Sequence, residues 1–231
     1  MIQGIRVLGL IPVRGGSKTI PKKNQKLLGG KPLMAWPIET ALATPEIDRV
    51  IVSSDDTDLC SIGIKYGAEA YVRSKELATD SSLIVDVIRN FWLRLKREGE
   101  TGLILVLLEA TSPFRTPELV SRCIERLVSE NLDSIATFRE ASINPERTWK
   151  IIDGNPLPFI EGAIPWKPRQ LLETAYQLDG GVYAFFPDRL PMDTPSLLFG
   201  KAGAEVTLGD SVNDIDSPMD LEIANAFLRI R

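Results

Sequence analysis

The feature of this chain that most constrains its fold is a regular alternation of short apolar runs with amphipathic segments. The apolar runs at 5–13, 49–54 and 102–108 are typical of strands buried on both faces of a parallel sheet. The segments between them carry apolar residues at helical spacing, most clearly at 83–97. Strands that alternate with helices form βαβ units, so the pattern predicts an α/β fold. We expect three layers, αβα, around a mostly parallel sheet of the Rossmann-like, nucleotide-binding type.

Local signals indicate where several elements begin and end. Helix caps are predicted at Thr116-Pro117, Ser217 to Asp220, Asp55-Asp56 and Gly67. Further helices are expected at 33–43, from Asp56 through Lys65 and from Pro218. Further strands are expected at 69–73, 134–138, 182–186 and 205–208.

The stretch from about 140 to 181 interrupts this rhythm. It is rich in proline, yet it also carries Trp149, Trp166 and Tyr176, which makes it too aromatic for a disordered linker. We interpret it as a small lobe inserted into a single domain that spans 1–231.

Composition excludes several classes of protein. The chain has 231 residues and no histidine, which excludes Ser-His-Asp and Cys-His catalysis. Its two cysteines, Cys60 and Cys123, cannot form a tetrahedral zinc site alone and are expected to be small core residues in a reducing compartment. No apolar run reaches the roughly 20 residues that span a bilayer. The net charge of −4 argues against a general nucleic-acid binder, and we expect a cytoplasmic protein without a membrane partner.

The charge is distributed unevenly, and this points to a small polyanion. Residues 14–31 contain six cations and no acid, which leaves 21 cations against 31 acids elsewhere. Gly15 and Gly16 follow the first strand and allow backbone N–H groups to close on a bound anion. Arg14, Lys18 and Lys23 add charge suited to a triphosphate. The loop matches neither the Walker A pattern nor the dinucleotide fingerprint.

Five motifs together resemble the acylneuraminate cytidylyltransferases, the CMP-sialic acid synthetases. They are residues 11–24 with 28–33, residues 50–56, Arg73 with 76–82, residues 111–115, and residues 214–218. Their order matches that of the family, and the resemblance covers nearly the whole chain.

The resemblance implies a role for each matching residue. CTP phosphates and ribose would be held by Arg14, Gly15, Gly16, Ser17, Lys18, Lys23 and Asn24, and cytosine would be read by Arg73, Ser81 and Ser82. Asp214 and Asp216 would bind Mg²⁺, and with Arg14 and Lys23 they are the expected catalytic residues. The sugar-acid acceptor would lie near Glu109, Thr111, Ser112, Arg115 and Asp179. Arg169 and Gln170 of the lobe would lie near a sugar acid, that of either subunit, because the lobe would pack on a second subunit of a homodimer.

Three positions depart from the family pattern. Thr19 replaces a glycine, Glu109-Ala110 replaces Gln-Pro, and Asp179-Gly180-Gly181 replaces Asn-Gly-Ala. A glutamate at 109 would repel the carboxylate of the acceptor unless it were protonated or paired. The acceptor therefore stays open between a nine-carbon nonulosonic acid, an eight-carbon sugar acid and a phosphonate.

The expected reaction is attack by the acceptor hydroxyl on the α-phosphorus of CTP, with loss of pyrophosphate. No side chain stands out as a general base, so a metal-bound water or the acidity of the acceptor is expected to serve. A non-catalytic CTP-binding regulator on the same fold is the alternative from another class. A glycosyltransferase is disfavoured because its Asp-x-Asp pair normally lies in mid-chain.

Overall fold

A computed structural model describes residues 1–207 and 214–230 of the chain. Its centre is a seven-stranded sheet in the order β11-β7-β10-β6-β1-β4-β5. The strands are β1 (Val7–Pro12), β4 (Arg49–Ser54), β5 (Glu69–Val72), β6 (Ile104–Leu107), β7 (Ser134–Glu140), β10 (Tyr176–Phe185) and β11 (Ala202–Val206). Only β10 runs antiparallel to its neighbours in this sheet, β6 and β7. The predicted α/β class with a mostly parallel sheet is confirmed.

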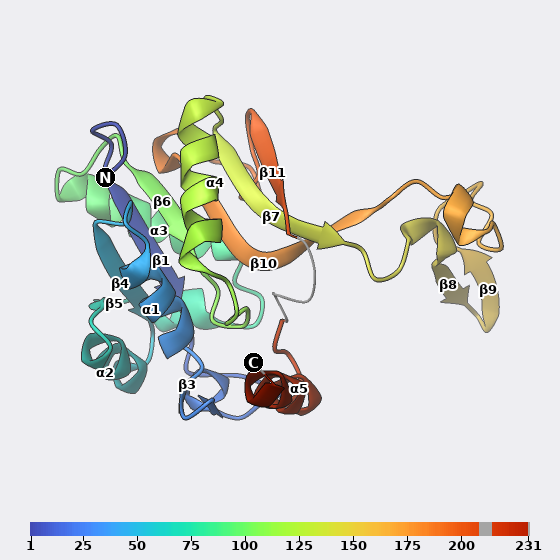
Figure 1. Ribbon diagram of the computed structural model, residues 1–231, viewed down its shortest axis with the longest axis horizontal. Helices are drawn as coiled ribbons and strands as arrows, with labels where there is room; N and C mark the ends of the chain where they lie inside the picture. The colour runs from blue at the N-terminus through green and yellow to red at the C-terminus, as the bar shows by residue number, and fades with distance from the viewer. Residues whose placement is uncertain (208–213, 231) are drawn as a thin grey trace.

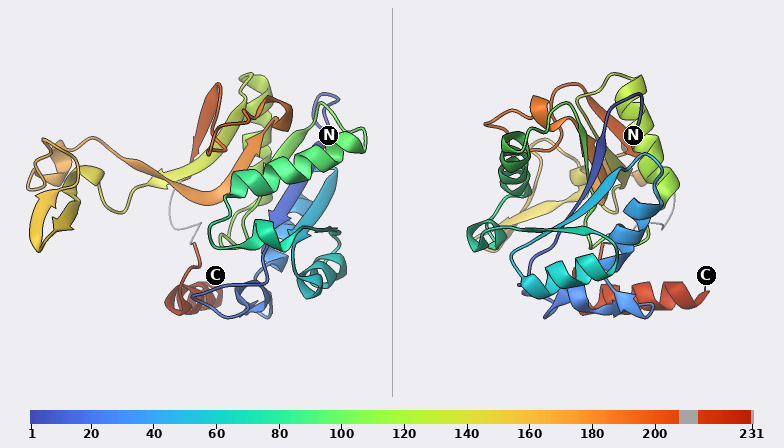
Figure 2. Two further views of the ribbon diagram at one scale, coloured as in Figure 1. Left: turned by 180° about the vertical axis from the view of Figure 1, so that it is seen from behind. Right: turned by 90° about the vertical axis from the view of Figure 1, so that its left-hand side faces the viewer.

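Helices cover both faces of this sheet, which gives the three predicted layers (Figure 1). One face packs against α1 (Ala35–Ala43), α2 (Thr57–Lys65) and α4 (Pro117–Ser129), and the other packs against α3 (Ile84–Arg97). Figure 2 shows α3 on the side of the sheet that faces away from α4. Alternation within β1 explains both cores: Val7 and Ile11 join the first cluster, whereas Leu8 and Leu10 join the second.

The predicted caps are confirmed in detail. Asp56 accepts hydrogen bonds from the backbone N–H groups of Asp58 and Leu59 at the start of α2. Gly67 follows that helix with φ +93°, in the left-handed region that glycine tolerates. Thr116 accepts from Leu119 N–H at the start of α4.

A smaller cluster packs the C-terminal helix α5 (Pro218–Ile230) against the hairpin of β2 (Leu27–Leu28) and β3 (Lys31–Pro32). Ser217 and Asp220 cap α5 reciprocally, as predicted: Asp220 Oδ2 accepts from Ser217 N–H at 2.7 Å, and Ser217 Oγ accepts from Asp220 N–H at 3.3 Å. The buried side chain of Ile215 joins the same cluster. This packing fixes the two acids that flank Ile215, and both line the cavity described below.

The lobe projects from the body at the far ends of β7 and β10 (Figure 1). It comprises residues 141–175 and holds the hairpin of β8 (Trp149–Ile152) and β9 (Asn155–Pro158). The predicted C-terminal boundary of 181 was wrong, because residues 176–178 already pair with β7 and 179–182 form an irregularity within β10. Gly180 has φ +69° at this irregularity.

Both cysteines are buried in helices, as predicted, and carry free thiols. Burial raises the pKa of the Cys123 thiol to about 12. Among the described helices, none combines the length and apolar character needed to cross a membrane.

Candidate active site

A cavity of about 380 Å³ opens beyond the carboxyl ends of β1, β5 and β6, where ligands bind in folds of this type. This volume lies within the usual range of small-molecule sites. Charged and polar residues dominate its lining, which includes Arg14, Lys23, Asn24, Arg73, Thr79, Asp80, Ser82, Glu109, Thr111, Asp214 and Asp216. Segments from four distant parts of the sequence therefore converge here.

Acidic side chains hold the basic loop, residues 14–24, in place. Arg14 and Lys18 each pair with Asp80 at 2.7 Å, and Gly15 N–H donates to Asp55 Oδ1 at 3.1 Å. A side chain at Gly15 would bring its Cβ to 2.7 Å from Asp56 Oδ2, so this close approach requires glycine. Asp80 and Asp55 therefore occupy hydrogen-bond donors of the loop that an anion would otherwise use.

Asp80 belongs to the motif at 76–82, but no role was predicted for it. It lies next to Ser81 and Ser82 and lines the cavity. Its hydrogen bonds with Lys18 and Arg14 hold the pKa of its carboxyl below the usual value. Its acidic character was visible in the sequence, but its distance of 66 residues from Arg14 hid the pairing.

The remaining members of the loop differ in their access to the cavity. Asn24 lines it and donates to Arg14 O at 3.0 Å, which fixes the loop backbone. Gly15, Gly16, Ser17 and Lys18 are not among the described residues that line it. The Lys18 side chain is 77% exposed and extends into solvent beside Asp80.

Arg73 lies beneath the site as a buried cation. It is 7% exposed and donates to Ser53 O at 2.9 Å, while its Nε has no hydrogen-bond partner among the described residues. Burial lowers the pKa of Arg73, and Asp55 opposes that shift. Ser82 also lines the cavity, although its hydroxyl is engaged with Thr79 and Glu76, whereas Ser81 does not appear among the described lining residues.

Asp214 and Asp216 enter the cavity from the segment before α5. Lys23 Nζ donates to Asp216 Oδ1 at 3.0 Å and to Ile215 O at 3.1 Å, which ties this segment to the basic loop. Ile215 N–H donates to Thr111 O at 2.8 Å and ties it to the end of β6. Desolvation raises the pKa of Asp214 although its side chain keeps solvent access, and a hydrogen bond from Thr111 opposes the shift.

These two acids fit a magnesium site on the chemistry of their donors. Two neighbouring carboxylates beside the cations of the loop would supply the hard oxygen ligands that Mg²⁺ prefers. The repulsion between Asp214 and Asp216 contributes to the raised pKa of Asp214, and a divalent cation would relieve it. Among the described residues, no cluster of three or more histidine, cysteine or acidic side chains forms a metal site.

The residues predicted to bind the acceptor separate into lining and supporting groups. Glu109 and Thr111 line the cavity. Ser112 and Arg115 lie behind it: Ser112 Oγ donates to Asp179 O at 3.2 Å, and Arg115 donates to the carbonyls of Glu109 and Gly180. The Asp179 carboxylate is buried and accepts from Gly181 N–H at 2.8 Å and from the Thr207 hydroxyl at 2.8 Å. The structure thus places Asp179 in the β10 irregularity, away from the cavity lining.

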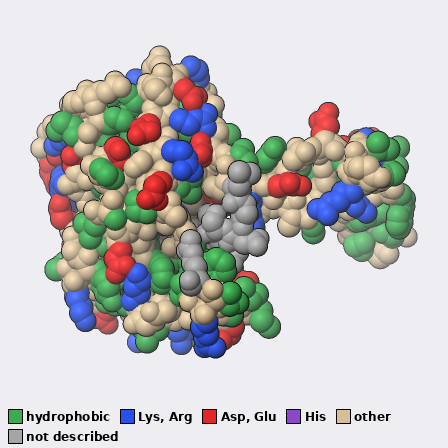
Figure 3. Space-filling view, in the orientation of Figure 1, with side chains coloured by type: hydrophobic (Ala, Val, Ile, Leu, Met, Phe, Trp, Pro, Cys, Tyr) green, Lys and Arg blue, Asp and Glu red, His purple; other side chains and the backbone are tan. Residues whose placement is uncertain are grey.

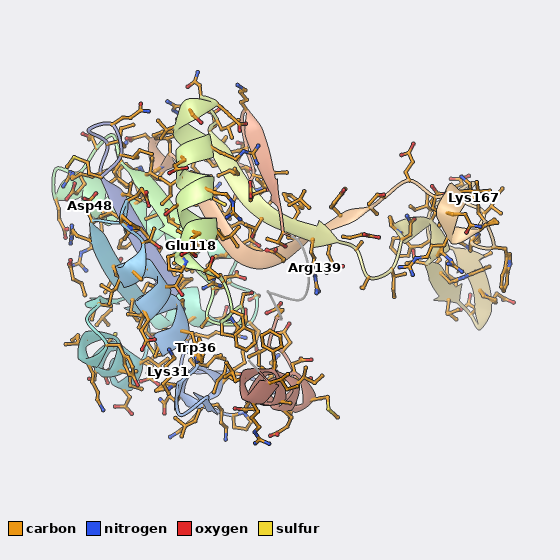
Figure 4. The ribbon with its side chains drawn as sticks, viewed as in Figure 1. Lys31, Trp36, Asp48, Glu118, Arg139 and Lys167 are labelled. Atoms are coloured by element: carbon orange, nitrogen blue, oxygen red, sulfur yellow. The ribbon has the colours of Figure 1, made fainter. Side chains whose placement is uncertain are left out.

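Arg169 and Gln170 belong to a short 3₁₀ turn of the lobe, outside the cavity lining. Figure 4 labels Lys167, close to them in sequence, at the tip of the molecule that is remote from the body. Within one chain they are not brought together with the other predicted site residues.

Comparison with known proteins gives a consistent result. The model of the cytidylyltransferase family matches residues 8–189. Pseudaminic acid cytidylyltransferase of Campylobacter jejuni is 28% identical over 224 residues, which are 96% of each chain. CMP-N,N'-diacetyllegionaminic acid synthase of Legionella pneumophila is 36% identical over 122 residues, 52% of this chain and 53% of that protein. N-acylneuraminate cytidylyltransferase A of Danio rerio is 36% identical over 129 residues, 56% of this chain and 29% of that protein.

Solved structures show the same fold at lower identity. A CMP:2-keto-3-deoxy-manno-octonic acid synthetase in complex with CTP superposes with a TM-score of 0.69 at 18% identity, covering 97% of this chain and 99% of that one. A 4-diphosphocytidyl-2C-methyl-D-erythritol synthase gives 0.68 at 14% identity, with the same coverage. Because the family model spans most of the chain, and the candidate site lies where this fold binds its ligands, the chain belongs to the cytidylyltransferase family.

Proposed function

We propose that this protein transfers CMP from CTP to a nonulosonic, sialic-type sugar acid and releases pyrophosphate. The observation that carries the proposal is the convergence of Arg14, Lys23 and Arg73 with the acids Asp214 and Asp216 in one cavity. Cations suit the triphosphate, and the acid pair suits its counter-ion. The relative from Campylobacter jejuni, which aligns over 96% of this chain, supports a nonulosonic acid as acceptor.

The residues of this chain contribute positioning and charge neutralisation. Arg14 and Lys23 would bind the phosphates and stabilise the leaving pyrophosphate. Arg73 and Ser82 would read the cytosine, in a part of the cavity also lined by Leu77 and Ala78. Arg14 and Lys18 would exchange Asp80 for phosphate oxygens when CTP enters.

The metal is part of this proposal. Asp214 and Asp216 would hold Mg²⁺, which when bound would neutralise charge on the phosphate oxygens. We expect Asp216→Ala to lower turnover by about 10²-fold or more and to raise the Mg²⁺ concentration needed for half-maximal rate. Full turnover at unchanged Mg²⁺ dependence in this variant would remove the metal assignment.

A homodimer is also proposed, with the lobe as its contact. Large apolar side chains of the lobe are exposed, including Trp166 at 83%, Ile151 at 66% and Phe159 at 64%. Exposed patches of this kind mark interaction sites in soluble proteins. Pairing through the lobe would also offer a route for Arg169 and Gln170 to reach a sugar acid. A cytoplasmic location accords with the use of CTP.

Pyrophosphate release with CTP and Mg²⁺ tests the proposal across a panel of acids. The panel comprises N-acetylneuraminate, its deaminated analogue, legionaminate, pseudaminate and the eight-carbon acid. Turnover with a nine-carbon acid is the expected result, and a preference for the eight-carbon acid would correct the acceptor. If no acid gave pyrophosphate release while CTP still produced a thermal shift, a non-catalytic CTP-binding protein would be favoured instead.

A further inference from the structure

The proposed reaction leaves one proton without an acceptor. The attacking hydroxyl loses its proton as it bonds to phosphorus, and a positioned base contributes about 10²–10⁴-fold to such steps. The chain contains no histidine. Lys23, the lysine of the cavity lining, is paired with Asp216, so the candidates for a base are the lining carboxylates and groups outside the protein.

Most carboxylates that line the cavity already have partners. Asp80 pairs with Arg14 and Lys18, Asp216 pairs with Lys23, and Asp214 accepts a hydrogen bond from Thr111. The carboxylate of Glu109, by contrast, has no hydrogen bond and no ion pair with any described residue. Among the described residues, Glu109 also forms no metal-binding cluster with Asp214 and Asp216.

The backbone of Glu109 is fixed by a buried neighbour and by hydrogen bonds from Arg115. It directly follows Leu108, which is fully buried and comes immediately after β6. The guanidinium of Arg115, itself 4% exposed, donates to Glu109 O and, at 3.2 Å, to Gly180 O. Arg115 thus joins the end of β6 to the β10 irregularity and fixes the point from which the glutamate side chain extends.

The β10 irregularity also leaves room for this side chain. A Cβ on Gly180 would lie 3.0 Å from Glu109 Oε2 and 2.8 Å from Ser112 Oγ. Any larger residue at 180 would therefore press on the carboxylate. Glycine at this position, which has φ +69°, lets the Glu109 carboxylate keep its place at the cavity wall.

We propose that Glu109 is the general base of the reaction, and this inference rests on the function proposed above. Its carboxylate takes the proton of the acceptor hydroxyl while the O–H bond breaks and the new O–P bond forms at the α-phosphorus. The bond between the α-phosphorus and its bridging oxygen breaks at the same time, and pyrophosphate leaves with the electron pair. Glu109 then returns the proton to solvent.

The electrostatic setting of Glu109 is suited to this role. Burial raises the pKa of its carboxyl to about 7, and Asp214 and Asp216 reinforce that shift, whereas Arg115 and Lys23 oppose it. Tyr183 of β10 interacts electrostatically with Glu109, and burial raises the pKa of its phenol, so it is neutral in this range. Arg115 keeps its charge, because burial lowers its pKa only to about 10. A base is most effective when its pKa lies near the working pH.

The test compares the wild type with Glu109→Gln, which keeps the size and polarity of the side chain but cannot accept the proton. We would measure kcat from pH 5.5 to 9 at saturating CTP, Mg²⁺ and the best acceptor of the panel. Glu125→Gln is the matched control, because Glu125 is exposed on α4 away from the cavity lining. A CTP-dependent thermal shift verifies that each variant folds and binds the nucleotide.

We expect Glu109→Gln to lower kcat about 10²-fold or more while the KM for CTP stays within about threefold. The rise of kcat with pH that a titrating base gives the wild type should disappear in the variant. In Glu109→Ala, added formate should restore part of the rate. A Glu109→Gln enzyme with near-normal kcat and an unchanged pH profile would overturn the assignment, even though the wild type remains an active cytidylyltransferase. A wild type that released no pyrophosphate with any acid would overturn the proposed function and, with it, this role of Glu109.

Discussion

The body and the lobe of this molecule both carry large apolar side chains, but the body buries them and the lobe exposes them. In the body, Phe185 and Leu107 are fully buried between the sheet and its helices. In the lobe, all four residues of β8 are exposed, and Trp149 packs edge-on against Trp166 with ring centroids 6.2 Å apart. Figure 3 shows apolar side chains gathered over the lobe, at the end remote from the body.

The difference teaches that apolar content alone does not make a core. The body stacks helices on both faces of a seven-stranded sheet, so its apolar side chains are removed from water within one chain. The lobe has only a two-stranded hairpin, which is too small to cover its own apolar side chains. The four predictions below test this contrast, from the largest expected effect to the smallest.

Truncation of the body core should cost the most stability. Phe185→Ala removes a fully buried ring that packs against Phe199 with centroids 6.1 Å apart. We expect the free energy of unfolding to fall by about 3–5 kcal/mol at every protein concentration. Urea denaturation measures this loss, and a loss below about 1 kcal/mol would mean that the body core is less tightly packed than described.

The buried acid of the body should make stability depend on pH. The carboxyl of Glu109 has a pKa of about 7 in the folded protein against an ordinary value of 4.5, so the folded state binds its proton more tightly. The stabilisation is complete below about pH 4.5 and is lost as the pH rises through about 7. Glu109→Gln should therefore be more stable than the wild type above pH 7, by up to roughly 3 kcal/mol, with the difference closing near pH 5.

Denaturation of the ligand-free protein at pH 5 and pH 8 measures this effect of Glu109. The control from the lobe is Glu161→Gln, because Glu161 is exposed and should show no such dependence. A Glu109→Gln protein whose stability parallels that of the wild type at both pH values would contradict the raised pKa.

The exposed apolar side chains of the lobe should matter through association. Trp166→Ser is expected to weaken the proposed dimer by at least tenfold, since buried aromatic residues dominate such contacts. Sedimentation equilibrium over a range of concentrations measures the dissociation constant. Ile64→Ser is the control from the body, because Ile64 is 61% exposed on α2. A wild type that stays monomeric at every concentration would exclude the dimer.

The smallest effect concerns helix caps. Asp56→Ala removes two hydrogen bonds at the start of α2, and we expect a loss of about 1 kcal/mol. Asn144→Ala also removes two bonds, both within the lobe: Asn144 accepts from Glu146 N–H and donates to Glu173 O, and the cap serves only a three-residue turn. Global denaturation should detect the first change and not the second, and equal losses would show that the lobe unfolds together with the body.

Local signals in the sequence were sufficient to predict most of the helices and strands. The periodicity of 83–97 predicted α3, and Thr116, Ser217 and Gly67 marked helix ends where the structure has them. These signals work because a cap or an apolar stripe involves residues only a few positions apart. The lobe boundary failed for the same reason: pairing of Tyr176 with Glu140 joins residues 36 positions apart, and nothing in the local sequence of 176–181 reveals it.

The sequence by itself determined the α/β class, the basic loop and the acid pair Asp214 and Asp216, because each depends on residues that are close together in the chain. Only the tertiary structure decided which of these side chains are available. It pairs Arg14 and Lys18 with Asp80, buries the carboxylate of Asp179 against Thr207, and leaves that of Glu109 at the cavity wall without a hydrogen bond or ion pair to any residue in 1–207 or 214–230. The physical reason is that a charge acquires its role from its burial and its neighbours, and both depend on strands and loops that meet only in the folded chain.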